Sequence, residues 1–124
     1  MDALQGLGLA FTCYVVECEY WHPMTTPNLL VELSGEHVGE LMSALSFHAG
    51  EVQRNPYHLE MIAWMMDNVR RGAELVGGQG AAAPNYLFGG LYRVRRWSNG
   101  QLGDIYPGGK LLSLTDAPAD LFPA

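Results

Sequence analysis

The chain contains little cysteine, with only two thiols among its 124 residues. Cys13 and Cys18 are five positions apart, which fits neither a CxxC pair nor the dense spacing of a disulfide-stapled fold. This spacing gives no support to a secreted disulfide scaffold, and both residues suit small apolar positions in a strand. We therefore expect a reducing, cytoplasmic compartment.

Basic residues are also scarce, because 7 Lys and Arg stand against 13 Asp and Glu and the formal net charge is −6. Nucleic-acid backbones and anionic membranes attract cationic proteins, so this charge argues against both as partners. Long apolar runs are missing as well, and the uncharged stretch Ala3–Val16 is too short to span a bilayer. An acidic residue, Asp2, stands where a secretory leader carries basic ones, so we expect no such signal.

What the chain does contain is the composition of a folded protein, with 48% hydrophobic and 16% charged residues. The length suits one ordinary domain. We expect a single α/β domain over residues 1–106. Residues 107–124 hold Gly108, Gly109 and three prolines, which predicts an irregular tail.

Strand patterns lie towards both ends of the chain. The apolar run Leu7–Val16 predicts a strand covered on both faces, as in a parallel sheet. Asn28–Leu33 predicts a short edge strand. Leu91–Trp97 and Gln101–Tyr106 flank the turn sequence Ser98-Asn99-Gly100, which predicts a hairpin-like segment.

Helical patterns occupy the middle of the chain. Ser34 is a suitable N-cap, and apolar residues at helical spacing predict one helix over about Glu36–Gln53. The Asn-Pro pair at 55–56 predicts the start of a second helix, which Gly72 or Gly77 would end. The predicted fold is therefore α/β, with a few mostly parallel strands, two central helices and a C-terminal β-hairpin-like segment.

The histidines are the most chemical-looking feature, but they form no HExxH or HxxxH pair and fall in different segments. A metal ion needs several converging donors, so local spacing predicts no metal site. His48 and Glu51 are three apart and so share a helix face. A carboxylate beside an imidazole can raise the pKa of the imidazole and orient it for proton transfer. The pair therefore fits either the catalytic site of a small hydrolase or an ordinary pair of exposed side chains on a helix.

Two carboxylates, Glu17 and Glu19, follow the first strand pattern at its C-terminal end, where ligand crevices form in open α/β sheets. Because they are two apart they would share a face, and paired carboxylates can do acid–base work. They equally fit the polar exit of a strand. The only basic cluster lies at residues 93–97, where alternation places Arg93 and Arg95 on one face and favours ion pairs or anion contacts over an RNA surface.

Several short elements follow one another in a specific order. They are, in turn, Glu19-Tyr20-Trp21, Pro23, Asn28, Leu30–Ser34, Ala44-Leu45-x-x-His48 and Arg71-Gly72. In this order and spacing, the stretch from about Val15 to Arg96 resembles the C-terminal half of the PIG-L (LmbE-like) N-acetylglucosaminyl deacetylase family. That family has a YExW-like strand end, a loop with Pro and Asn, a helix motif K-x-x-A-[LI]-x-x-[HY]-x-S-Q and a later Arg-Gly.

The chain also departs from that pattern. Leu41 occupies the lysine position of the helix motif, and Gly50-Glu51 replaces its Ser-Gln pair. Asn85–Phe88 lacks the acid of a later AEAF-like element. The family's H-P-x-D-[DE] motif is missing, since the only His-Pro pair, at residues 22–23, is followed by Met-Thr-Thr.

The resemblance implies a Rossmann-like α/β fold and a zinc-dependent amidohydrolase, in which a metal-bound water attacks the acetamide of an N-acetyl sugar. The family holds its zinc with the H-P-x-D-[DE] motif and a mid-chain histidine that do not occur here. We therefore assign no catalytic residue, no metal ligand and no cofactor to this chain. Glu19, Trp21 and His48 are the candidate residues of a substrate pocket for an amino sugar.

We therefore expect a partial Rossmann-like domain that forms the C-terminal part of a GlcNAc-type deacetylase-like protein. We expect this part to be inactive alone, and the sequence does not decide whether the chain is an enzyme. Some family members are joined to a glucosamine-6-phosphate deaminase-like domain, so such a parent protein is also open. The alternative is a non-catalytic interaction or oligomerisation module. Its partner would be a second copy or a full-length protein, because the edge left by missing strands recruits other chains.

Overall fold

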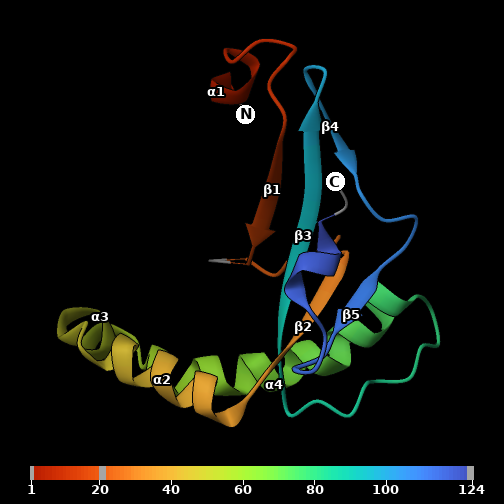
Figure 1. Ribbon diagram of the computed structural model, residues 1–124. Coiled ribbons are helices and arrows are strands. Elements are labelled where there is room, and N and C mark those ends of the chain that lie inside the picture. Colours follow the sequence, from red (N-terminus) through yellow and green to blue (C-terminus); the bar gives the residue numbers. More distant parts are fainter. Residues whose placement is uncertain (1, 20–21, 123–124) are drawn as a thin grey trace.

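The computed structural model describes residues 2–19 and 22–122. Its sheet is built around β3 (Phe88–Ser98), which has neighbours along both edges (Figure 1). β1 (Cys13–Cys18) pairs antiparallel with one edge. β2 (Leu29–Leu33) and β4 (Gln101–Asp104) pair antiparallel with the other edge, and β5 (Lys110–Leu112) runs parallel to β2.

This sheet confirms the mixed α/β class and corrects the expected strand directions. Three of the four pairings are antiparallel, so the expectation of mostly parallel strands is wrong. That expectation came from the uncharged run at residues 7–16, yet β1 begins only at Cys13, lies at an edge of the described sheet and has no buried side chain. An apolar run does not report strand direction, because the connections between strands decide it.

The hairpin between β3 and β4 is confirmed. Asn99 and Gly100 have φ angles of 52° and 74°, as a two-residue turn of type I′ requires at both central positions. Ser98 pairs with Gln101 directly across the turn. The return strand ends at Asp104, before the predicted Tyr106.

The predicted helix over residues 36–53 is two helices, α2 (Gly35–Ser46) and α3 (Ala49–Arg54). The cap is confirmed, since the Ser34 hydroxyl accepts a hydrogen bond of 3.0 Å from the His37 N–H. At the break, the N–H groups of Phe47 and His48 bond three residues back instead of four. The apolar spacing resumes after these two residues, so periodicity alone does not reveal the interruption.

The second predicted helix is α4 (Tyr57–Gly77), which follows Pro56 and ends at Gly77 as expected. The next residue, Gly78, has a φ of 96°, which a residue with a side chain rarely adopts. A single turn, α1 (Asp2–Gln5), lies at the start of the chain. Among residues 2–19 and 22–122, no helix is long and apolar enough to cross a membrane.

Both faces of the sheet carry apolar clusters. α4 packs against β2 and β3 on one face, where Gly72 allows a close approach, since a Cβ there would lie 2.9 Å from Leu91. Leu30 and Leu91 of the sheet and Val76 of α4 form the cluster at this contact. The cluster on the other face consists of Leu29, Val94, Leu112 and Leu121.

The last two of those residues come from the segment 107–124, so the prediction of an irregular tail is wrong in part. This segment forms β5 and the 3₁₀ turn η1 (Pro118–Leu121). Its β5 flanks β2, which is therefore an interior strand and not the predicted edge strand. A strand of three residues beside glycines and prolines has no detectable periodicity, so only long-range pairing reveals it.

Candidate functional site

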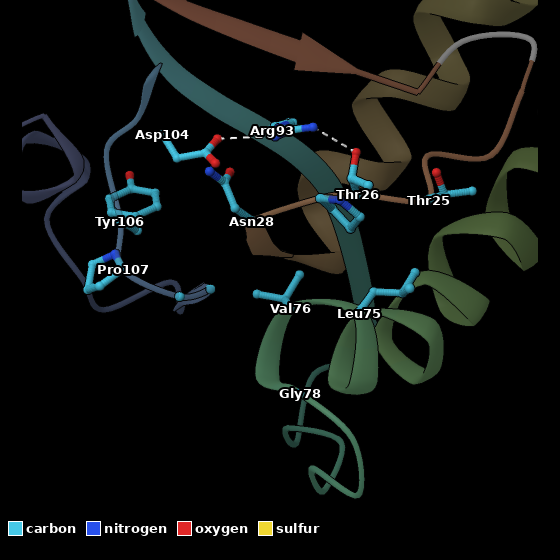
Figure 2. Close-up of a pocket in the computed structure, with 13 residues that line it drawn as sticks. Thr25, Thr26, Asn28, Leu75, Val76, Gly78, Arg93, Asp104, Tyr106 and Pro107 are labelled. Carbon is cyan, nitrogen blue, oxygen red and sulfur yellow. Dashed lines mark hydrogen bonds and ion pairs between the residues drawn. The ribbon is translucent and has the colours of Figure 1, made fainter. Parts of the chain in front are cut away.

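A pocket of about 470 Å³ lies between the end of α4 and the β3–β4 side of the sheet (Figure 2). Four parts of the chain line it: residues 25–28, the last turn of α4 with Gly78, Arg93 of β3, and residues 104–109 apart from Ile105. The walls thus come from segments far apart in the sequence. We call it the Arg93 pocket.

Arg93 lies between two polar partners, as Figure 2 shows. Its guanidinium donates to the Thr26 hydroxyl at 2.9 Å and to the Asp104 carboxylate at 3.2 Å. The Arg93 side chain is 29% exposed and that of Asp104 is 53% exposed. Among the described residues, only Arg93 contacts the Asp104 carboxylate, and it does so through one of the two oxygens. A cation of fixed position and a carboxylate with free accepting capacity therefore face the same opening.

The Asn28 side chain stabilises the wall of the pocket. It bonds to the backbone of β3 in the way that a neighbouring strand would. Its side-chain amide donates to the Val94 carbonyl at 2.8 Å, and its side-chain oxygen accepts from the Val94 N–H at 2.7 Å. Val94 lies between the part of β3 that pairs with β2 and the part that pairs with β4. The Asn28 side chain therefore satisfies backbone groups that neither strand reaches.

The floor of the pocket is apolar and closely packed. Leu75 and Val76 of α4 lie opposite Arg93 in Figure 2. Gly109 passes so near the helix that a Cβ there would lie 1.9 Å from the Val76 carbonyl oxygen. Tyr106 stands at the side and donates to the Leu121 carbonyl at 2.9 Å. Burial raises the pKa of the Tyr106 phenol, with a further contribution from Tyr14, so the phenol is neutral at physiological pH.

Glu19, a predicted pocket residue, does not line the Arg93 pocket. Its side chain is only 7% exposed, and both carboxylate oxygens lie 2.9 Å from an Arg71 nitrogen. The same carboxylate accepts hydrogen bonds from the Trp64 indole at 3.0 Å and from the Met24 N–H at 2.6 Å. All of its accepting groups are engaged, so Glu19 ties the segment after β1 to helix α4.

The contacts continue from Arg71 into the sheet. Arg71 donates to the buried Asn68 side chain at 2.6 Å, and Asn68 donates to the Gly89 carbonyl at 3.0 Å. The Arg71 guanidinium also lies 5.2 Å from the centre of the Trp64 ring, within cation–π range. We call Glu19, Trp64, Asn68 and Arg71 the Glu19 cluster. Its polar groups satisfy one another, which is the property of a structural network.

The other two predicted pocket residues have different outcomes. Trp21 lies outside the described residues. His48 is exposed, precedes α3 and borders a separate apolar groove of about 320 Å³ between α2 and α4. The predicted pairing of the His48 imidazole with the Glu51 carboxylate does not form in the described structure, because that carboxylate pairs with Arg54; His48 and Glu51 share only a backbone hydrogen bond.

The predicted carboxylate pair is also divided. Glu17 pairs with Arg95 while Glu19 pairs with Arg71, so each acid has its own arginine and the two do not form one acid–base site. The interpretation of the basic cluster as ion pairs is confirmed by the Arg93–Asp104 and Arg95–Glu17 contacts. Arg96 points to the other face, 5.8 Å from the centre of the Tyr14 ring.

Sequence reasoning missed Thr25, Thr26, Asp104 and Tyr106 as pocket residues. A signal for Asp104 was present in the hairpin, because pairing counted from the Asn-Gly turn places Asp104 opposite Arg95. Arg93 lies two residues farther along on the same face. The two threonines gave no such signal, since their loop reaches the pocket only through tertiary contacts.

In the described part of the chain, the possible metal donors do not lie together. Within residues 2–19 and 22–122, no three His, Cys, Asp or Glu side chains lie close enough together to hold a metal ion. The described donors therefore do not form a site for the zinc of the resembled family. Comparison of the chain with protein families, curated proteins and solved structures finds no match.

Proposed function

We propose that the chain binds a small amino sugar in the Arg93 pocket, as the C-terminal, non-catalytic part of a deacetylase-like protein. The observation that carries this proposal is the placement of the Arg93 guanidinium, one free Asp104 oxygen and the Thr26 hydroxyl in a pocket that has an apolar floor and that Thr25 also lines. Sugars present hydroxyl groups at their rim and C–H groups on their ring faces, so this combination suits them.

Each wall of the pocket has a role in that proposal. Asp104 accepts from an ammonium or hydroxyl group, and Arg93 and Thr25 donate to ring hydroxyls or to an acetamide oxygen. Leu75 and Val76 pack against the apolar face of the sugar ring. The volume of about 470 Å³ is in the range of small-molecule sites.

The resemblance to the PIG-L family supports the same ligand class, because that family acts on N-acetyl sugars. Under this proposal the described sheet is the C-terminal portion of a Rossmann-like domain, and the parallel β2–β5 pair, with helices in its connection, is compatible with that origin. Both described cysteines are free thiols, which suits a reducing cytoplasm. The chemistry of hydrolysis would belong to residues beyond this chain.

The proposal is tested by titrating the isotopically labelled chain with glucosamine and with N-acetylglucosamine. We expect saturable NMR shift changes at residues of the Arg93 pocket. Asp104→Asn should weaken glucosamine binding by about tenfold to a hundredfold, because a charge-assisted hydrogen bond contributes about 1.5–3 kcal/mol.

Asp120→Asn is the matched control, since it removes an exposed carboxylate in η1 that does not line the pocket. Equal weakening by both variants, or shifts that avoid the pocket, would overturn the proposal. Acetate release from N-acetylglucosamine by the isolated chain would contradict the non-catalytic part.

A second candidate function, an oligomerisation module, is favoured by the open edge of β1. In the described sheet β1 pairs only with β3, and its Val16 is exposed. Unpaired edges recruit further strands, so a second copy or a full-length relative would add there. Light scattering over a range of concentrations should then detect a dimer that Val16→Lys dissociates and Leu87→Lys, an equally exposed control, does not. A monomer at every concentration would contradict the oligomerisation function.

A further inference from the structure

The apolar groove lies between α2 and α4, which pack side by side and extend beyond the sheet in Figure 1. Its volume is about 320 Å³, and Leu41, Met42, Leu45, Met61, Met65 and His48 line it. No residue of the Arg93 pocket takes part, so the groove is a separate feature of the molecule. We call it the α2–α4 groove.

The groove stays open to solvent although its walls are apolar. Leu41 in its wall is 46% exposed, and Phe47, beside His48 at the end of α2, is 86% exposed. Methionines come from both helices, and their flexible thioether side chains adapt to different partners. An apolar groove between two helices is the form of site that receives the apolar face of another helix.

The helical segment that forms this groove carries more acidic than basic residues. The segment from α2 to α4, residues 35–77, holds six acids and three arginines. All three arginines are engaged, Arg54 with Glu51, Arg70 with Asp67 and Arg71 with Glu19. The acids left without an ion pair among the described residues are Glu36, Glu40, Glu60 and Glu74.

Two of these acids are close in sequence to residues that line the groove. Glu40 is one helical turn before Ala44, which also lines the groove, and Glu60 directly precedes Met61. Both residues are exposed. An apolar groove in a helical segment with exposed, unpaired acids is complementary to a helix that has an apolar stripe between basic residues.

We propose that the α2–α4 groove binds a basic amphipathic helix of a partner protein. A second copy of this chain is the less suitable occupant, because it would bring an excess of acids to an acidic surface. A basic helix gains from both the apolar floor and the unpaired acids. This inference does not depend on sugar binding in the Arg93 pocket.

The test uses three synthetic peptides of leucine and lysine or glutamate. The first has leucines at helical spacing and lysines elsewhere, the second has the same residues in scrambled order, and the third replaces lysine by glutamate. We expect the patterned basic peptide to bind at least about tenfold more tightly than either of the others. The intrinsic fluorescence of the tryptophans and NMR shifts at α2 and α4 measure binding.

Variants of the chain locate the peptide. Leu41→Asp places a charge in the groove and should weaken binding about tenfold or more, whereas Leu87→Asp, outside the groove, should not. The double variant Glu40→Lys/Glu60→Lys reverses the charge of two acids close in sequence to groove residues and changes only exposed positions. Its control, Glu74→Lys/Asp120→Lys, makes the same change in net charge elsewhere.

Circular dichroism checks that each variant is folded, and the double variant decides the question if Leu41→Asp is not. Equal binding of patterned and scrambled peptides would overturn the proposal, as would equal weakening by the two double variants. A dimer of the wild-type chain that Leu41→Asp dissociates would also overturn it and would identify a second copy as the occupant.

Discussion

Two arginine–carboxylate pairs in this chain have the same chemistry and opposite surroundings. In the Glu19 cluster the side chains of Arg71 and Glu19 are 18% and 7% exposed, and further donors occupy the carboxylate. In the Arg93 pocket the side chains of Arg93 and Asp104 are 29% and 53% exposed, and a carboxylate oxygen is free to accept. A saturated, buried pair holds elements together, whereas an unsaturated pair at an opening can receive a ligand.

The largest difference between the two pairs should be in stability. Arg71→Ala leaves the buried Glu19 carboxylate without its cation, which costs about 3 kcal/mol of unfolding free energy. Arg70→Ala is the matched control, because Arg70 is exposed and its pair with Asp67 should contribute less than about 0.5 kcal/mol. Urea denaturation measures both. Equal effects of the two variants would show that the Glu19 cluster does not stabilise the fold.

The second largest loss of stability should come from a substitution in the wall of the Arg93 pocket. Asn28→Ala removes both hydrogen bonds to the backbone of Val94, a residue that is fully buried. Leaving these groups without partners costs about 2 kcal/mol. Amide hydrogen exchange at Val94 should accelerate in the same variant. Unchanged exchange there would indicate that other groups replace the Asn28 side chain.

Asp104→Asn should change stability much less than Arg71→Ala does. The Asp104 side chain is half exposed, so loss of its ion pair should alter the unfolding free energy by about 0.5 kcal/mol or less. Its expected effect on glucosamine binding is far larger. A loss of stability comparable with that of Arg71→Ala would remove the contrast between the two pairs.

The smallest effect should be a loss of stability at alkaline pH. Burial raises the pKa of Tyr106 and also that of Tyr92, so the folded state favours the neutral phenols. The contribution is fully present below the ordinary phenol pKa of 10.0 and is lost as the pH rises through the raised folded-state pKa. Urea denaturation between about pH 9 and 11 should show a steeper decline for the wild type than for Tyr106→Phe. Parallel declines would contradict this assignment.

Local signals in the sequence were sufficient for the helical segment and the hairpin. The hydroxyl of Ser34 caps α2, Gly78 follows the end of α4, and Asn99-Gly100 forms the turn, because each depends on residues close by in the chain. The break at Phe47 and His48 escaped prediction because it keeps the apolar spacing on both sides. β5 escaped because its pairing partner lies far away in the sequence.

The candidate residues divide in the same way. Glu19 was noticed from its place after a strand, but its burial against Arg71 and Trp64 follows from the packing of α4, more than 40 residues later. Arg93 was seen as part of an ion-pairing cluster, and the hairpin register explains its partner Asp104. The pocket around Arg93 and Asp104 forms only when the Thr25–Asn28 loop and the Gly108–Gly109 segment come together.

The sequence by itself determined the α/β composition, the cap of α2, the ends of α4, the turn of the hairpin, and the acidic, cysteine-poor character of the chain. These properties depend on composition and on neighbours within a few residues. The tertiary structure alone decided the strand directions, the role of residues 107–122 in the sheet and core, and which of two arginine–carboxylate pairs is saturated. The reason is physical: the free energy of a charged or apolar group depends on how much water surrounds it, and that is settled only when distant segments pack together.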